Sequence, residues 1–130
     1  MKNISVSPSA VRPKPAETAS ADCVLLVDDD ELARPLVADL LRQAGYMVTE
    51  AANAQDAFSA ARGMERLDLL VSDVVMPGLG GPQMVAQLRA ERPALRVVYI
   101  TGHPAGHVLQ GERVLSKPFT AAQLLDIMQA

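Results

Sequence analysis

The sequence contains no tryptophan, a single cysteine and very few aromatic residues. Aromatic residues make up 3% of the 130 positions, against 49% for all hydrophobic residues, so the core has to be built from aliphatic side chains. The one cysteine, Cys23, excludes an intramolecular disulfide, and we expect its thiol to be buried. Such a composition suits a sheet covered by helices.

The sequence also lacks a strong charge of either sign and any long hydrophobic run. Its 12 basic and 15 acidic residues give a net charge of −3, which is too weak and too evenly spread to predict binding to nucleic acid or to an anionic membrane. The apolar stretches fall far short of the roughly 20 residues that a membrane-spanning helix needs. We therefore expect a cytoplasmic protein.

Residues 1–21 differ from the rest of the chain. They are rich in Ser, Pro, Lys, Ala and Thr and show no sustained hydrophobic period, which predicts a disordered tail or linker. No apolar stretch in them is long enough for a secretory signal. We expect one folded domain over residues 22–130, with no output domain, since a single domain usually takes roughly 100 to 150 residues.

Carboxylates follow two of the apolar runs in this folded region. Asp28, Asp29 and Asp30 come directly after the run VLLV, and Asp73 follows the run LLV after one small residue. Such runs are typical of buried parallel strands, whose carboxyl ends carry the ligand sites of open α/β sheets. Carboxylates this close need a cation to offset their repulsion, and oxygen ligands favour Mg²⁺ or Mn²⁺ over zinc.

Two further apolar runs end in a hydroxyl and an ammonium group. Thr101 closes the run VVYIT, and Lys117 follows the shorter segment VLS. A metal-binding acid pair, a lone aspartate, a hydroxyl and an ammonium form the set that capture of a phosphoryl group on a carboxylate requires. The metal and the lysine offset phosphoryl charge while the aspartate attacks.

Four motifs in this order, VLLVDDD, SDVVMPG, YITG and SKPF, resemble the receiver domain of bacterial two-component response regulators. The resemblance covers about residues 22–130. It implies Mg²⁺-dependent phosphorylation of Asp73 by a phosphohistidine donor, either a histidine kinase or a histidine phosphotransfer protein. It implies that Thr101 and Lys117 contact the phosphoryl group. It also implies a metal site made of oxygen ligands, those of Asp28, Asp29, Asp73 and the Val75 backbone carbonyl.

Strands alternating with helices predict a doubly wound parallel sheet with right-handed crossovers and helices on both faces. The family's version is flavodoxin-like, with five strands in the order 2-1-3-4-5, and implies that Asp28, Asp29 and Asp73 lie together. Asp30 is expected to cap a first helix that ends near Ala44. The remaining elements are predicted over residues 46–50, 67–72, 97–101 and 114–116 for strands and 53–62, 82–92 and 120–128 for helices.

Two positions interrupt this regular pattern. Pro35 lies beyond the first turn counted from Asp30, so we expect the first helix to start late, near Arg34, or to kink. Between Thr101 and Lys117 only 15 residues remain for a loop, a helix and the last strand, so we expect the fourth helix to be shortened or missing.

The resemblance implies a phosphoacceptor rather than a turnover enzyme, present as a monomer or a weak dimer. Its donor is expected to dock its helices against the first helix, near Leu32, Arg34 and Pro35. The position three before Lys117, which the family often fills with an aromatic residue, is Val114 here. The family's usual coupling of that aromatic residue to the threonine is therefore not expected.

Two other function classes stay open. The acidic run also satisfies the D-x-D motif of a haloacid dehalogenase-type phosphohydrolase, with Asp28 as nucleophile and Asp30 as acid/base. Against this class, Glu31 and Leu32 replace the expected Gly-Thr or Gly-Val. The other alternative is a non-phosphorylated docking module with an eroded output face. Exchange of Asp73 for Asn distinguishes the three classes.

Overall fold

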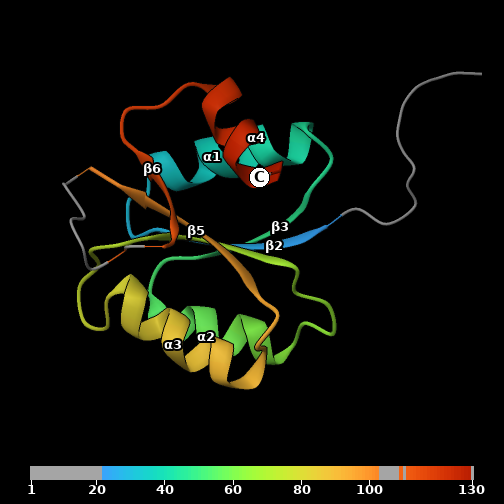
Figure 1. The fold of residues 1–130 in the computed structure, drawn as a ribbon, viewed down its shortest axis with the longest axis vertical. Coiled ribbons are helices and arrows are strands. Elements are labelled where there is room, and N and C mark those ends of the chain that lie inside the picture. Colours follow the sequence, from blue (N-terminus) through green and yellow to red (C-terminus); the bar gives the residue numbers. More distant parts are fainter. Residues whose placement is uncertain (1–21, 103–108, 110, 130) are drawn as a thin grey trace, which may run out of the picture.

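The computed structural model describes residues 22–102, 109 and 111–129, and these form five strands and four helices. From β2 to β5 strands and helices alternate along the chain (Figure 1). The tail predicted over residues 1–21 lies outside the described residues. In chain order the elements are β2 (Cys23–Val27), α1 (Ala33–Gln43), β3 (Met47–Ala51), α2 (Ala54–Arg62), β4 (Leu69–Asp73), α3 (Gly81–Glu91), β5 (Arg96–Thr101), β6 (Arg113–Ser116) and α4 (Ala121–Gln129).

The five strands form one parallel sheet in the order β3-β2-β4-β5-β6, which is the predicted order 2-1-3-4-5. Helices α1 and α4 cover one face of the sheet and α2 and α3 cover the other (Figure 1). The predicted doubly wound α/β fold is therefore confirmed. The direction of strand addition reverses between β2 and β4, the position where such sheets place their ligands.

Two aliphatic clusters hold the helices on the sheet. On the α2 and α3 face the cluster includes Leu25, Leu70 and Met84, and on the α1 and α4 face it includes Leu26 and Leu124. Successive residues of each strand point to opposite faces, so every central strand serves both clusters. The core contains almost no aromatic side chains, as the composition predicts. Cys23 at the start of β2 is only partly buried, so the prediction of a buried thiol was wrong.

The element boundaries lie within one or two residues of those predicted. Helix α1 starts at Ala33, which places Pro35 in its first turn, and the expected late start is confirmed. The Asn53 side chain caps α2 by accepting a hydrogen bond from the Asp56 N–H at 2.8 Å. At the start of α4, Thr120 and Gln123 form a reciprocal capping box. Among the described residues no helix has the length and apolarity needed to cross a membrane.

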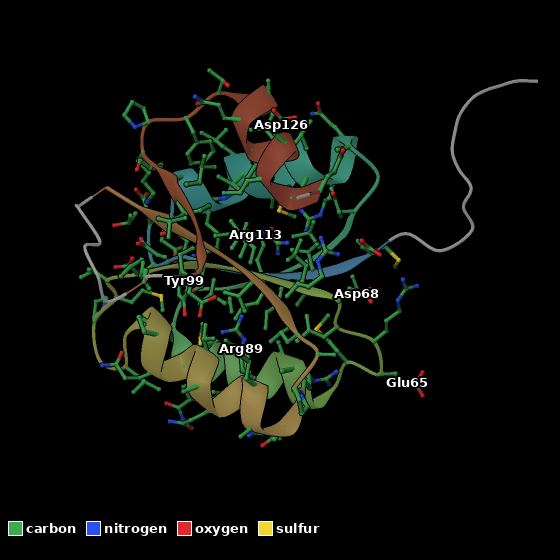
Figure 2. All side chains as sticks on the ribbon, viewed as in Figure 1. Glu65, Asp68, Arg89, Tyr99, Arg113 and Asp126 are labelled. Carbon is green, nitrogen blue, oxygen red and sulfur yellow. The ribbon has the colours of Figure 1, made fainter. Side chains whose placement is uncertain are left out.

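An ion pair joins α3 to the residues that precede β6. Arg89 contacts both carboxylate oxygens of Glu112, at 2.8 and 3.3 Å, beside the buried ring of Tyr99. Figure 2 shows Tyr99 and Arg89 on the same side of the sheet. Burial raises the pKa of Tyr99 to about 12. The shortened or missing fourth helix was expected between Thr101 and Lys117, and residues 103–108 and 110 of that stretch lie outside the described residues.

Two arginines cap the C-termini of helices. Both lie at the edge of the sheet where the strands begin, opposite the edge that carries Asp28 and Asp73. The Arg92 guanidinium donates to the backbone oxygens of Ala61 and Met64 at 2.9 and 2.6 Å, and so caps the C-terminus of α2. Arg96 donates to the Met128 oxygen at 2.8 Å near the end of α4. Cations at these positions satisfy backbone oxygens that have no partner within the helix, and they complement the helix dipole.

We expect Arg92→Met to lower the free energy of unfolding by about 1 to 3 kcal/mol, because it leaves two carbonyl oxygens without their charged donor. Urea unfolding followed by circular dichroism measures the change. Arg62→Met is the matched control, since the one side-chain contact of Arg62 to the described residues is a long one, 3.4 Å to Ser59, in an exposed position. Equal stability of the two variants would show that the Arg92 cap contributes nothing.

Candidate functional site

The carboxyl ends of β2, β4, β5 and β6 meet at one edge of the sheet and carry the predicted polar residues. In the parallel register Val27 of β2 lies opposite Ser72 of β4. The next residue after each of them is Asp28 or Asp73, so these two aspartates lie side by side where the strands end. On the other side of β4, Asp73 lies opposite Ile100. Thr101, the last residue of β5, lies opposite Ser116, which precedes Lys117. Strand pairing therefore brings these residues together from distant parts of the sequence.

Three carboxylates converge at this edge. Asp28, Asp29 and Asp73 each offer an oxygen atom, and these oxygens all lie within 4.8 Å of one another. Asp28 is buried, with 3% of its surface exposed, whereas Asp73 is partly buried and Asp29 faces solvent. The Asp30 N–H donates to Asp28 Oδ1 at 3.0 Å, which orients the Asp28 carboxylate from within its own loop.

Lys117 is the cation of this cluster. Its ammonium lies 3.5 Å from Asp73 Oδ2 and 3.6 Å from Asp28 Oδ2, so it contacts carboxylates on two different strands. Its backbone N–H donates to the Thr101 oxygen at 2.8 Å, which fixes the loop after β6 to the end of β5. The Lys117-Pro118 peptide bond is cis.

The cluster carries more negative than positive charge. With all three carboxylates ionised, the three acids and one ammonium carry a net charge of −2 at a site where Asp28 is buried and Asp73 is partly buried. Burial raises the pKa of Asp28 above its ordinary value, and the nearby charge of Asp73 adds to the rise, while the Asp30 N–H and Lys117 oppose it. One divalent cation would neutralise the excess.

The donor set fits a hard divalent cation. Every side chain of the cluster offers carboxylate oxygen, which is the ligand type that Mg²⁺ and Mn²⁺ prefer, and none offers sulfur or imidazole. The solvent-facing side at Asp29 leaves room for the water ligands that Mg²⁺ usually keeps. The residues present therefore fit the metal that the sequence predicts.

The other two predicted residues border the cluster. Thr101 is buried, with 2% of its surface exposed, at the end of the strand next to Asp73. Val75 lies in the loop after β4, two residues beyond Asp73, and 59% of its surface is exposed. The sequence-based prediction that Val75 controls the access of water to Asp73 stays a prediction.

Three supporting contacts were not anticipated from the sequence. The buried Ser72 hydroxyl donates to the Asp73 backbone oxygen at 2.8 Å. A Cβ at Gly81 would collide with the same oxygen, so only glycine lets the start of α3 approach Asp73 so closely. The third contact is a hydrogen bond of 2.8 Å from the Arg34 side chain to the Asp28 oxygen. For the close approach of α3 to Asp73, the Gly80-Gly81 pair after the Met-Pro-Gly turn was the one signal in the sequence.

Arg34 does not lie where it was expected. Only 12% of its side chain is exposed, because the guanidinium turns toward the acidic loop and β3 instead of toward solvent. The neighbouring apolar residues Leu32 and Leu36 are instead 82% and 66% exposed. An exposed apolar pair therefore flanks the start of α1, and Arg34 instead contacts the loop that carries Asp28.

A family model for the response regulator receiver domain matches residues 24–129. A response regulator receiver protein of Anaeromyxobacter is 36% identical over 109 residues, which cover 79% of this chain and 45% of that protein. The receiver protein CpdR of Brucella abortus is 31% identical over 109 residues, which cover 79% of this chain and 90% of CpdR.

Solved structures give the same result. The chemotaxis protein CheY4 of Vibrio cholerae superposes with a TM-score of 0.78 at 30% identity, and the match covers 85% of this chain and 98% of that one. The receiver domain of the hybrid histidine kinase CckA gives a TM-score of 0.71 at 33% identity, with 82% and 95% covered.

Some relatives are longer than the matched region. The matches cover 45% of the Anaeromyxobacter protein and 48% of the transcriptional regulatory protein TcrX of Mycobacterium tuberculosis. The comparison thus concerns one domain that recurs in proteins of different length. Because the family match spans nearly all the described residues, this chain belongs to the receiver domain family of response regulators.

Proposed function

We propose that Asp73 is the phosphoacceptor of this receiver domain and that Lys117 and Thr101 contact the transferred group. One observation carries the proposal: the Lys117 ammonium lies within 3.6 Å of carboxylates on both β2 and β4, where three acids converge. An ammonium held against the acceptor also faces the oxygens of any phosphoryl group that binds there. Receiver domains are phosphoacceptor modules, and the proposal assigns that property to named residues.

In the proposed reaction an Asp73 carboxylate oxygen attacks the phosphorus atom of a phosphohistidine. The new O–P bond forms as the P–N bond breaks, and the electron pair of that bond stays on the nitrogen. The ring leaves as neutral imidazole when its other nitrogen carries a proton. Lys117 offsets the charge that builds on the phosphoryl oxygens, and the Thr101 hydroxyl supplies a hydrogen bond.

The acidic cluster would hold Mg²⁺, with Mn²⁺ as a substitute, through Asp28, Asp29, Asp73 and the Val75 backbone carbonyl. When bound, the ion supplies positive charge that offsets the repulsion between the acceptor and the phosphoryl group. Asp28 keeps its place through the hydrogen bonds from the Asp30 N–H and the Arg34 side chain, and this orientation is its contribution to transfer.

The donor is expected to be a histidine kinase or a histidine phosphotransfer protein. Three exposed apolar side chains, Leu32 just before α1, Leu36 on α1 and Val75 two residues after Asp73, are proposed as the positions on which helices of the donor pack. We propose a cytoplasmic protein, monomeric or weakly dimeric, that accepts the group once per cycle and does not turn over a small substrate. The folded domain is proposed to span residues 22–130, preceded by a disordered tail.

The phosphohydrolase alternative assigns Asp30 the part of acid/base. In the structure the Asp30 carboxylate accepts hydrogen bonds from the N–H groups of Leu32 and Ala33, at 2.9 and 3.1 Å, before α1 begins. These bonds lower the pKa of Asp30, so it holds its proton less readily than an ordinary carboxyl. This capping arrangement disfavours a proton-donating role.

We expect Asp73→Asn to abolish the phosphoryl adduct that forms with phosphoramidate and Mg²⁺, because an amide oxygen is a far weaker nucleophile than a carboxylate. Intact-mass spectrometry counts the adducts directly. Asp126→Asn, on the exposed surface of α4 (Figure 2), is the matched control and should be modified like the wild type. An adduct that survives in Asp73→Asn would exclude Asp73 as the acceptor. The absence of an adduct in every form would favour the docking module.

Asp28→Asn should raise the free energy of unfolding of the metal-free protein near neutral pH. The raised pKa of Asp28 means that its ionised form is disfavoured in the folded state, and the amide removes this cost. The gain should shrink as the pH falls toward 3.8, the ordinary value for aspartate, since the wild-type carboxyl is then protonated as well.

Urea titrations with and without Mg²⁺ check this second prediction. Mg²⁺ at about 100 times its Kd should stabilise the wild type by about 2.7 kcal/mol and the Asp28→Asn variant by much less. The control Asp126→Asn should keep the full effect of the metal. A destabilised, metal-free Asp28→Asn protein at neutral pH would contradict the electrostatic explanation.

Val75→Asn should shorten the lifetime of the phosphoryl group on Asp73. The exposed valine offers no hydrogen bond, whereas an amide at this position can hold a water molecule near the phosphorus atom. The decay of the adduct after removal of the donor, followed by intact mass, gives the lifetime. Val75→Leu is the apolar control, and equal decay rates in the Asn and Leu variants would refute the role of the amide.

A further inference from the structure

The Arg34 side chain is the most highly connected polar group near the site. Its Nη1 donates to the Asp28 backbone oxygen at 2.8 Å and to Glu31 Oε2 at 2.9 Å. Its Nη2 donates to Glu31 Oε1 at 2.8 Å, and its Nε donates to Glu50 Oε1 at 3.3 Å. The guanidinium thus joins the residue after β2, the loop before α1, α1 itself and β3.

Asp28 is held on three sides by these and neighbouring bonds. Its N–H donates to the Ala51 oxygen at the end of β3, at 3.1 Å, and its carboxylate accepts the Asp30 N–H. The Arg34 contact to its backbone oxygen supplies the third. Of the three, the Arg34 contact is the one supplied by the side chain of another residue, so a substitution can remove it while both partners of the other two bonds remain.

We propose that Arg34 is a positioning residue for the metal-binding loop: it ties the Asp28 backbone to Glu31 and Glu50 and so holds Asp28 and Asp29 in the arrangement that binds the divalent cation. The inference rests on the proposed function, in which these acids hold Mg²⁺. It concerns affinity for the metal and makes no claim that Arg34 touches the reacting groups.

The charges around Arg34 point to a geometric role. Its positive charge faces the carboxylates of Glu31 and Glu50, at 2.8 and 3.3 Å, so it adds little net charge to the metal site. Lys117, by contrast, directs its ammonium at Asp28 and Asp73. The planar fork of arginine can bind two partners at fixed angles, which lysine cannot do. The shape of the Arg34 side chain, more than its charge, should therefore matter.

Arg42 provides a matched control on the same helix. It also contacts Glu50, at 3.3 Å, and it contacts Asp39 at 3.8 Å, but no bond to Asp28 is recorded for it among the described residues. Arg42→Met therefore removes a cation and a contact to Glu50 without touching the loop. Any effect that comes only from charge, or from loosening α1 against β3, should be shared by the two arginine variants.

The test is a Mn²⁺ titration of the full chain, followed by electron paramagnetic resonance of the free ion, well below the unfolding temperature. We expect Arg34→Met to weaken Mn²⁺ binding about tenfold or more, a loss typical of groups that orient metal ligands. Arg34→Lys should fall between Arg34→Met and the wild type. Arg42→Met should bind like the wild type. Circular dichroism confirms that each variant is folded at the temperature of the titration.

The outcomes separate this inference from the proposed function. Wild-type protein that binds Mn²⁺, with equal affinity in Arg34→Met, would overturn the role of Arg34 and leave the phosphoacceptor proposal intact. Wild-type protein that binds no Mn²⁺ would overturn both. If Arg34→Met does not fold, Arg34→Lys decides, because full affinity in that variant would contradict the need for the fork. If Arg34→Met and Arg42→Met weaken Mn²⁺ binding equally, the effect comes from the loss of a positive charge, and the positioning role of Arg34 is refuted.

Discussion

The parallel pairing of β2 with β4 determines where the charges of the site lie. Because Val27 is in register with Ser72, the next residues on the two strands are Asp28 and Asp73, and their carboxylates are forced together at the sheet edge. The apolar cores on both faces stabilise this pairing, so the sheet can hold acids at a separation that they would not adopt in solution. Because the carboxylates are held so close, positive charge beside them is favourable. The Lys117 ammonium supplies part of it, and the site fits a divalent cation that would supply the rest.

The cost of this arrangement falls mainly on Asp28. It is the most buried of the three acids, and burial raises its pKa while Lys117 only partly offsets the charge. In a site of this kind, close carboxylates lower the stability of the metal-free protein and raise its affinity for cations and, with them, for phosphoryl groups. The excess negative charge that adds to burial in raising the pKa of Asp28 is also what a divalent cation would offset, so under the proposed function stability and metal affinity both depend on this carboxylate.

Much of the fold and the location of the site could be predicted from the sequence. Aliphatic runs followed by Asp28, Asp73, Thr101 and Lys117 predicted strands whose carboxyl ends meet, and turn and cap residues such as Asn53 predicted the helix boundaries to within a residue or two. These signals are local, since hydrophobic period and capping depend on neighbours in the chain. The roles of the individual site residues remain predictions.

The contacts that the sequence did not predict are those made by single side chains across elements. Arg34 was expected beside Leu32 and Pro35, where the donor docks, yet its side chain turns to partners in the residue after β2, the loop before α1 and β3. Nothing in the local sequence specifies that Glu50, sixteen residues later, lies within its reach. The two cations differ in what they contact. Lys117 follows the last strand and directs its ammonium at the carboxylates of Asp28 and Asp73, whereas Arg34 on α1 binds the Asp28 backbone oxygen and the Glu31 side chain. The Lys117 charge therefore acts on the carboxylates directly, whereas Arg34 acts on them through the loop that carries Asp28.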